Sequence, residues 1–235
     1  SASYSGSFKV VDDLLDATLS DSNLTKYYSG SEKLQITLKD SNNKAFANQR
    51  ITVKISSKEY NLVTNSKGQA FLDVDFNPGS YNAEVIFEQT EKYHAASTNA
   101  TVTVLSTAEG IDVVKLYGSG TQYFAIFTDA KGNALGNTKV TFKIGSRSYD
   151  LTTLPNVIAR ININFKAGTY TIKATNPATG QTISNKITIY YKIMENKDVS
   201  NYYGAKTNYK VRIYTDGYKH VGAGKAVTFK VNGKT

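Results

Sequence analysis

The sequence predicts an all-β protein built from tandem immunoglobulin-like β-sandwiches, with a partial third repeat toward the C-terminus. The first observation behind this prediction is a five-residue pattern that occurs three times, at residues 51–55, 140–144 and 227–231. In each copy apolar residues alternate with Thr and Lys, as in a strand with one face toward a core and one toward water. β-Branched and aromatic residues dominate the pattern, which favours a strand over a helix.

The second observation is a long internal repeat. Tyr28 aligns with Tyr117 at an offset of 89, and the match continues without a gap to Tyr81 and Tyr170. The third observation is the spacing of turn residues, which divides each repeat into about seven short strands. This pattern is typical of an immunoglobulin-like sandwich, and the absence of Cys and Trp excludes the antibody subtype.

The first repeat begins near Ala17, and alternating apolar residues predict its strands. They cover residues 33–39, 51–55, 59–63, 70–76, 81–87 and 101–105. Turns rich in Asp, Asn, Ser, Pro and Gly separate these strands, as tight turns require. In the second repeat the turn that ends at Gly68 is replaced by Leu-Pro-Asn-Val at 154–157. We therefore expect this corner to be built differently in the two repeats.

The repeats also predict the domain boundaries. Residues 1–16 form an N-terminal segment with a short strand at 8–11, residues 17–106 the first repeat, residues 107–194 the second, and residues 195–235 an incomplete third. The third repeat contains Asn232-Gly233, the strongest short signal for a hairpin. Because the strands that would follow this hairpin are missing, we expect the third repeat to be half a domain.

The chain is basic, with 28 Lys and Arg against 19 Asp and Glu and a formal net charge of +9. Such a balance is found in proteins that bind nucleic acid, anionic membranes or acidic polymers. Here the Lys residues are spread along the chain without a run, which favours the alternative that they keep an exposed β-surface soluble. No apolar run reaches about 18 residues, so we expect no membrane insertion in this segment.

Pairs of aromatic residues occur near the expected domain junctions. Examples are Tyr27-Tyr28, Tyr190-Tyr191 and Tyr202-Tyr203. Binding of single-stranded nucleic acid needs stacking aromatics that converge on one basic groove. Their position at junctions favours packing between repeats, so we expect no nucleic-acid partner. Stacking on carbohydrate is the alternative.

We expect no enzyme activity, no cofactor and no metal site. The two His residues, His94 and His220, lie in different repeats and match no metal-spacing motif. A hydrolase generally needs a carboxylate pair or a nucleophile with a base. Asp73 and Asp75 lie two apart on one predicted strand, which fits a solvated face better than half of a calcium site.

Several short motifs together resemble a known class of repeats. They are Tyr-Tyr/Gly before the second strand, a Thr-Asp-x-x-Gly turn, Val-Thr-Phe-Lys-Ile/Val-x-Gly, and Asn-Pro-Gly-Ser/Thr-Tyr. This set resembles the immunoglobulin-like repeats of the large surface adhesin-like proteins of methanogenic archaea. It is similar, more loosely, to the bacterial immunoglobulin-like repeats of surface adhesins and invasins. The resemblance covers roughly residues 24–235, and Ala167-Gly168 and residues 154–157 depart from it.

The resemblance implies an extracellular, cell-surface protein whose repeats form a stalk that holds a binding region away from the cell wall. It offers no catalytic residues. The partners it implies are neighbouring repeats of the same or another copy, and cell-wall or host glycans. A carbohydrate-binding accessory module of a cell-wall enzyme is a weaker alternative.

A further alternative is a self-assembling filament or sheath subunit, completed by strand exchange between molecules. In this hypothesis Phe8 and Val10 of one molecule pair with Val227, Phe229 and Val231 of the next. An exposed strand edge readily accepts a foreign strand. Head-to-tail contacts of this kind do not close on themselves and would produce filaments.

The sequence also contains candidate residues for two covalent modifications. Some surface immunoglobulin-like domains join a Lys of the first strand to an Asn of the last, and the candidates here are Lys26 with Asn99 and Lys115 with Asn185. Asn23 and Asn99 lie in Asn-x-Thr glycosylation motifs, which carry meaning only in a secreted chain.

Overall fold

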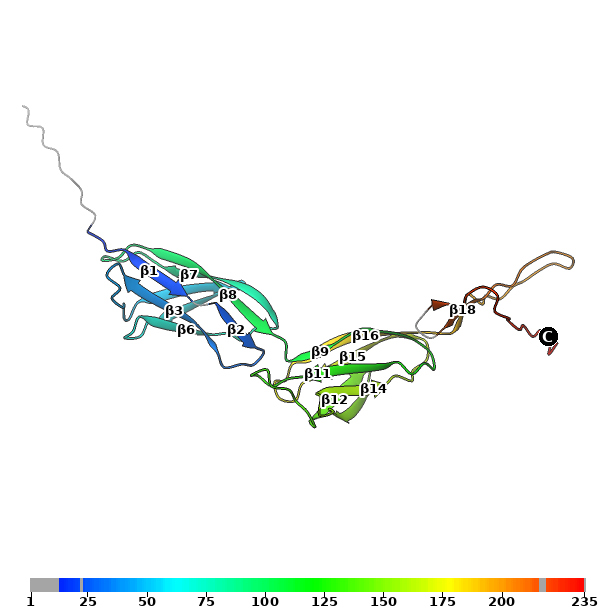
Figure 1. The fold of residues 1–235 in the computed structure, drawn as a ribbon. Helices are drawn as coiled ribbons and strands as arrows, with labels where there is room; N and C mark the ends of the chain where they lie inside the picture. Colours follow the sequence, from blue (N-terminus) through cyan, green and yellow to red (C-terminus); the bar gives the residue numbers. More distant parts are fainter. Residues whose placement is uncertain (1–12, 22, 216–218, 235) are drawn as a thin grey trace, which may run out of the picture. The chain divides into compact units, whose positions relative to one another are not determined.

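The computed structural model describes residues 13–21, 23–215 and 219–234, and every regular element among them is a β-strand. The predicted strand at 8–11 lies outside these residues. The chain divides into two compact units, unit 1 up to Ser106 and unit 2 from Thr107, with the short turn 130–132 grouped with unit 1. Each unit is described by itself below (Figure 1).

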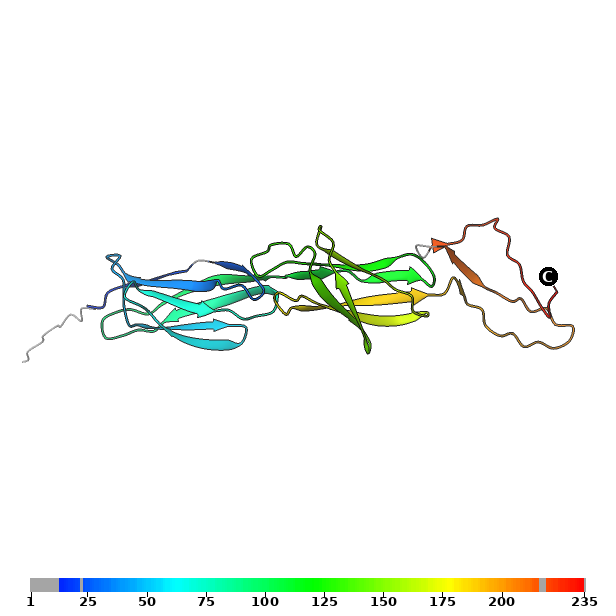
Figure 2. The same ribbon diagram turned by 90° about the horizontal axis from the view of Figure 1, so that it is seen from below.

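Unit 1 is a sandwich of a three-stranded and a five-stranded sheet, seen as two layers in Figure 1 and Figure 2. The smaller sheet has the order β1 (Ala17–Asp21), β3 (Lys33–Asp40), β6 (Gln69–Asp73). The larger has the order β2 (Leu24–Tyr27), β8 (Ala96–Leu105), β7 (Gly79–Phe87), β4 (Arg50–Ile55), β5 (Lys58–Val63). All paired strands are antiparallel except β2 and β8, which run parallel.

Unit 2 repeats this plan. Its smaller sheet has the order β14 (Ile158–Asn162), β11 (Gln122–Phe127), β9 (Ala108–Gly110). Its larger sheet has the order β10 (Val113–Leu116), β16 (Thr182–Tyr190), β15 (Gly168–Thr175), β12 (Lys139–Ile144), β13 (Arg147–Thr152). Again one pair of strands, β10 and β16, runs parallel, and the other paired strands of the unit are antiparallel. The prediction of tandem immunoglobulin-like sandwiches is therefore confirmed.

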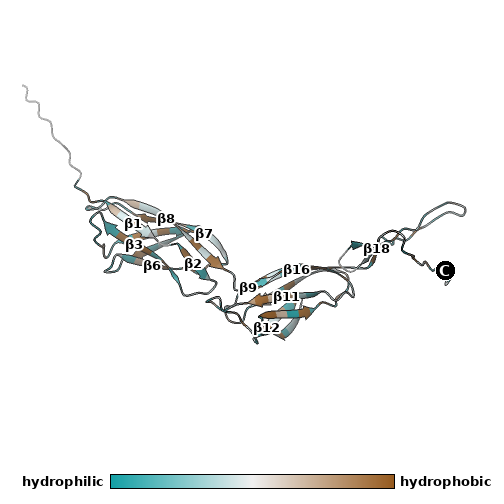
Figure 3. Cartoon of the chain, viewed as in Figure 1, coloured by the Kyte–Doolittle hydropathy of each residue, from teal (hydrophilic) through white to brown (hydrophobic). Residues whose placement is uncertain are grey.

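The core of each unit lies between its two sheets and is filled by alternate residues of each strand. On β4, Ile51 and Val53 are fully buried, and on β12 the same positions hold the buried Val140 and Phe142. The Lys residues that follow Val53 and Phe142, Lys54 and Lys143, face solvent. Figure 3 shows this alternation as bands of teal and brown along the strands. The period-two pattern of the sequence thus places the core where it was expected.

The turn at Val157 corrects one expectation. We expected unit 2 to build this corner differently, but Val157 adopts φ 65°, close to the φ 70° of Gly68 in unit 1. The backbone hydrogen bonds also match, since Val157 donates to Leu154 as Gly68 donates to Asn65. The ladder on either side fixes the turn, and a β-branched residue is held in the left-handed region, which is unfavourable for it.

One corner of the sandwich is packed differently in the two units. In unit 1, Phe46 stacks on Tyr93 with ring centroids 3.9 Å apart and lies 6.4 Å from the ring of Phe87. At the position of Phe87, unit 2 has the fully buried Asn176. Its amide donates to the backbone oxygens of Thr107 (2.7 Å) and Thr128 (2.8 Å). An apolar corner is thus replaced by a hydrogen-bonded one.

The connection that leads into the last strand of the sandwich differs in length between the two units. Lys26 lies opposite Val104, and Lys115 lies opposite Ile189. The offset between repeats is therefore 89 for the two lysines (26 to 115) but 85 for their partners (104 to 189). Counted between aligned residues of the two ladders, the chain that leads into β16 is four residues shorter than the chain that leads into β8, so a residue of β8 has its counterpart at an offset of 85.

The C-terminal segment forms one small sheet, β17 (Ile193–Met194), β18 (Arg212–Thr215) and β19 (Lys219–His220). The predicted strand at 227–231 was wrong, because the backbone there is irregular and Val227 and Phe229 are each 45% exposed. The same five-residue pattern forms strands in units 1 and 2, where a second sheet covers its apolar side. The Asn232-Gly233 turn is confirmed: both residues have positive φ, and Val231 and Lys234 exchange two hydrogen bonds.

Candidate functional site

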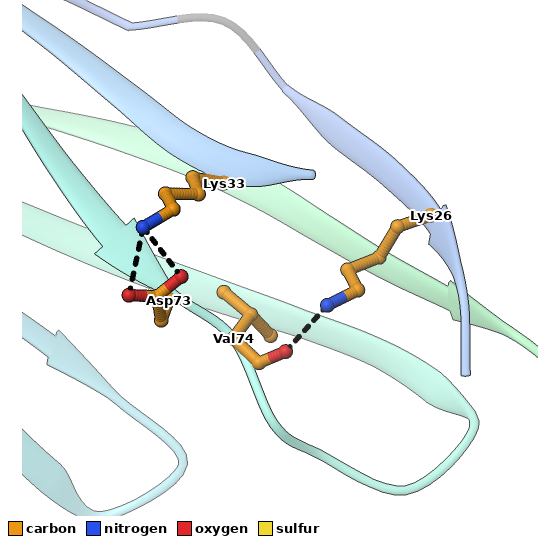
Figure 4. A network of polar contacts seen from close by, with 4 residues as sticks. All are labelled: Lys26, Lys33, Asp73 and Val74. Atoms are coloured by element: carbon orange, nitrogen blue, oxygen red, sulfur yellow. Dashed lines mark hydrogen bonds and ion pairs between the residues drawn. The ribbon is translucent and has the colours of Figure 1, made fainter. Parts of the chain in front are cut away.

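The most distinctive side chain of unit 1 is a buried lysine. Lys26 is 6% exposed, and its Nζ donates a 2.7 Å hydrogen bond to the backbone oxygen of Val74 (Figure 4). Lys26 belongs to β2 of the larger sheet, whereas Val74 directly follows β6 of the smaller one. Nearby, Lys33 forms an exposed ion pair with Asp73 at 3.0 Å. The two lysines differ because Lys26 shares the inward face of β2 with the buried Leu24.

Unit 2 has the same arrangement at Lys115, which is 3% exposed. Its Nζ donates to the backbone oxygens of Ile163 at 2.7 Å and Thr121 at 2.9 Å. Burial lowers the pKa of the Lys115 ammonium below its ordinary value. Ile163 is the counterpart of Val74, so both units use one buried amine to fasten the first strand of one sheet to the end of a strand in the other.

The structure does not bring Lys26 close to Asn99. Asn99 lies opposite Glu84 on β8, five residues before Val104, which lies opposite Lys26. At about 3.3 Å per residue this separation is roughly 17 Å along the strand. Asn99 faces solvent, whereas the amine of Lys26 points into the sandwich toward Val74.

Lys115 and Asn185 are separated in a similar way. Asn185 lies on β16 four residues before Ile189, the residue opposite Lys115. By register the counterpart of Asn99 in unit 2 is Ser184, opposite Lys173, so Asn185 lies on the other face of its strand. The crosslink stays a prediction for mass measurement, and these positions do not favour it.

Asn185 takes part in a different polar cluster. Its Oδ1 accepts a 2.8 Å hydrogen bond from the hydroxyl of Tyr123, and its amide donates to the backbone oxygen of Gly110 at 3.1 Å. Tyr123 is fully buried. Burial, with a smaller contribution from the negative charge of Asp112, raises the pKa of Tyr123 to about 12. This hydroxyl therefore stays protonated and joins β11 to β16, the sheet opposite its own.

The remaining sequence candidates lie apart from these clusters. Asn23 and Asn99 are both exposed, and the Oδ1 of Asn23 accepts a 2.8 Å hydrogen bond from the backbone of Thr101. Phe8 and Val10 lie outside the described residues. Val231 is 70% exposed. Accessibility of both asparagines is compatible with glycosylation, which stays a prediction.

The outer face of the smaller sheet in unit 2 is a feature that sequence reasoning missed. Phe124 of β11 is 42% exposed there, beside the partly exposed Ile126 and Ile158. Phe124 borders two shallow grooves, one of which extends past the exposed Ile111 to Ile183 on β16 and has a volume of about 490 Å³. A position-by-position comparison of the repeats could have found this face.

Known proteins were compared with the sequence and the fold. No family model and no curated protein matches the sequence. The fold is similar to that of the Yersinia pseudotuberculosis adhesin InvE, with 17% identity, TM-score 0.32, and coverage of 75% of this chain and 60% of that one. It is also similar to a 1.5-MDa bacterial ice-binding adhesin, with 15% identity, TM-score 0.33, and coverage of 76% and 65%.

A calcium-stabilised adhesin of an Antarctic bacterium that binds ice is similar as well, with 15% identity, TM-score 0.30, and coverage of 75% and 50%. The matched region thus spans less than two thirds of each of these adhesin structures. Because every TM-score is below 0.5, the assignment of the sandwich fold rests on the strand order and register given above. The archaeal source and the filament role find no support in these comparisons.

Within residues 13–21, 23–215 and 219–234 there is no group of three or more His, Asp or Glu that could hold a metal ion. The same part of the chain contains no helix long and apolar enough to cross a membrane.

Proposed function

We propose that this chain is an extracellular segment of a cell-surface adhesin-like protein, in which the immunoglobulin-like repeats act as a stalk that bears tension. The observation that carries this proposal is the parallel pairing, in each unit, of the second strand in sequence with the last strand of the sandwich. In unit 1, Leu24–Tyr27 pairs with residues 102–105, and in unit 2, Val113–Leu116 pairs with residues 187–190.

This pairing determines how a pulling force is resisted. Tension along the chain pulls the start of β2 and the end of β8 in opposite directions. Because the two strands run parallel side by side, this force slides one past the other, and their hydrogen bonds must break together rather than one by one. The same holds for β10 and β16 in unit 2.

The buried lysines strengthen the element that carries the load. For β2 to slide, Lys26 must release the backbone oxygen of Val74, to which it donates inside the sandwich. For β10 to slide, Lys115 must release Ile163 and Thr121. Breaking a buried hydrogen bond leaves a polar group without a partner in a poorly solvated place, which is costly.

Single-molecule force spectroscopy on the full chain tests this proposal. We expect two distinct unfolding events, each releasing roughly 300 Å of chain, since about 90 residues span ~3.4 Å each when extended. Lys26→Met and Lys115→Met should each lower the force of one event. Lys54→Met, at an exposed position of β4, is the matched control. Unfolding of both units at forces too low to resolve would contradict a role in bearing tension.

A second candidate, assembly by strand exchange, is favoured by the exposed apolar side chains of the C-terminal segment. Val227 and Phe229 are each 45% exposed and lie outside any strand, so they could be covered by a strand of another molecule. Deleting residues 1–11 tests whether Phe8 and Val10 supply that strand. If the shortened chain associates as strongly as the full one, this donor is excluded.

The archaeal source and the glycan partners stay proposals that follow from the sequence resemblance. Binding of the intact chain to a panel of purified cell-wall and host glycans tests the second of these. A chain that binds none of them would leave the stalk role without the adhesive one.

A further inference from the structure

Unit 2 exposes an apolar face at a place where unit 1 exposes a polar one. On β11 of unit 2, Phe124 and Ile126 point outward, and Ile158 lies beside Ile126 on β14. At the same positions of unit 1 the outward residues are Gln35 and Thr37 on β3 and Gln69 on β6.

The polar face of unit 1 shows what this sheet carries when it only contacts water. Beside its Gln and Thr residues it has the exposed ion pair of Lys33 with Asp73 and one isolated aromatic residue, Phe71. Contiguous apolar surface on a soluble domain usually marks an interaction site, whereas scattered apolar residues do not. The contrast between two copies of one scaffold therefore assigns an interaction surface to unit 2 alone.

Two opposite charges flank the apolar residues of this face. Arg160 lies opposite Phe124 on β14, and Glu109 lies opposite Ile126 on β9, with β11 between them. Both side chains are exposed, and neither forms an ion pair with another described residue. An aromatic centre with a flanking Arg is the composition that protein interfaces favour.

We propose that this face binds the same face of a second copy of the chain. A two-fold axis along β11 would place the β14 side of one copy over the β9 side of the other. Arg160 is level with Phe124 and Glu109 with Ile126, so the two charges of facing copies are displaced by two residues, roughly 7 Å, along the strand. The long side chain of Arg160 spans this displacement to reach Glu109 of the partner copy, with Phe124, Ile126 and Ile158 of both copies between the two ion pairs. The face is self-complementary in charge, as a two-fold interface requires. This inference is independent of the stalk function.

Sedimentation of the full chain over a concentration series is the test. We expect the mass to rise reversibly from the monomer value of 25.7 kDa toward a dimer. A triple variant, Phe124→Gln, Ile126→Thr and Ile158→Gln, gives unit 2 the residues that unit 1 carries on the same scaffold. These residues are compatible with the fold, so the variant should remain folded and lose dimerisation by about tenfold or more in Kd.

The charge arrangement gives a sharper test. Arg160→Glu alone should weaken dimerisation by about tenfold or more, and adding Glu109→Arg should restore it, because the exchanged charges attract again. Lys143→Glu, on the exposed face of β12, changes the net charge by the same amount and should have no such effect. A chain that stays monomeric at every concentration would overturn the proposal. So would a dimer unaffected by the triple variant, or an Arg160→Glu defect that Glu109→Arg does not repair.

Discussion

The ammonium of Lys115 donates to the backbone oxygen of Ile163 at 2.7 Å, and the equivalent lysine of unit 1 makes the same contact at the same distance. This contact joins the two sheets of a sandwich through a side chain type that ordinarily faces water. It recurs while many core residues around it differ between the units, which identifies it as part of the shared framework.

Replacing this lysine should weaken unit 2. Lys115→Met keeps an apolar stem but removes the donor to Ile163 and Thr121. Leaving buried acceptors unpaired costs about 1–3 kcal/mol. Because the variant no longer buries an ammonium group, part of this cost is offset. We therefore expect the free energy of unfolding to fall by an amount toward the lower end of this range. Urea denaturation of the full chain measures it. Lys143→Met, at an exposed site, should change the free energy of unfolding by less than about 0.5 kcal/mol.

The buried phenol should make unit 2 sensitive to alkali. The pKa of Tyr123 is raised to about 12 from 10.0, so the folded state favours the protonated form. The stabilisation is fully present below pH 10 and is lost as pH rises toward 12; two pKa units correspond to roughly 3 kcal/mol. We expect Tyr123→Phe to abolish this loss in urea unfolding across that pH range.

Unit 1 supplies the control for the alkaline transition, because Leu34 stands at the position of Tyr123. The lowered pKa of Lys115 acts in the opposite direction, since the folded state then binds this proton less tightly than the unfolded one. Its contribution makes unit 2 more stable as pH rises toward the ordinary lysine value. This contribution is the same in the wild type and in Tyr123→Phe. The difference between their pH profiles of stability therefore isolates the contribution of the Tyr123 phenol. Equal pH profiles for the two proteins would refute its role.

The second and third copies of the five-residue pattern should contribute very differently to stability. Phe142 is fully buried against Tyr123 and Phe127, with ring centroids 5.4 and 6.4 Å away. Phe142→Ala should reduce the stability of unit 2 by about 3–5 kcal/mol. Phe229→Ala, in the third copy, should leave the unfolding of both units unchanged. A comparable loss from Phe229→Ala would mean that the third copy is packed against a folded core.

The intact mass of the chain should be the mass of its sequence. An isopeptide bond between Lys26 and Asn99 or between Lys115 and Asn185 would remove one ammonia, but each pair is separated along the strand ladder. High-resolution mass spectrometry of the denatured chain decides this. Loss of one or two ammonia molecules, located by peptide mapping, would contradict the register described here.

Much of the fold could be predicted because a strand's apolar positions repeat with period two. This period predicts that Ile51 and Phe142 face a core, and both are fully buried. The same reasoning failed at Phe229, since the pattern states which face is apolar but not whether a second sheet exists to cover it. It also could not anticipate Val157, whose backbone is held in the left-handed region by hydrogen bonds on both sides.

The candidate sites were harder to predict from the sequence. The sequence marks Lys26 and Lys115 as candidates for a covalent bond, but it does not predict their burial, because a lysine in an alternating strand normally faces solvent. The outer face around Phe124 was missed because Ile126 and Ile158 fit a core as well as a surface. Only the counterparts in unit 1, Thr37 among them, show that these positions point outward.

The exchange of Phe87 for Asn176 has a consequence for how the two units respond to temperature. Apolar surface raises the heat-capacity change of unfolding when it becomes exposed, and polar surface lowers it. The aromatic corner of Phe46, Phe87 and Tyr93 therefore steepens the curvature of stability in unit 1, and the amide network around Asn176 flattens it in unit 2. Since hydrophobic stabilisation weakens on cooling, cold loosens this corner of unit 1 more than that of unit 2.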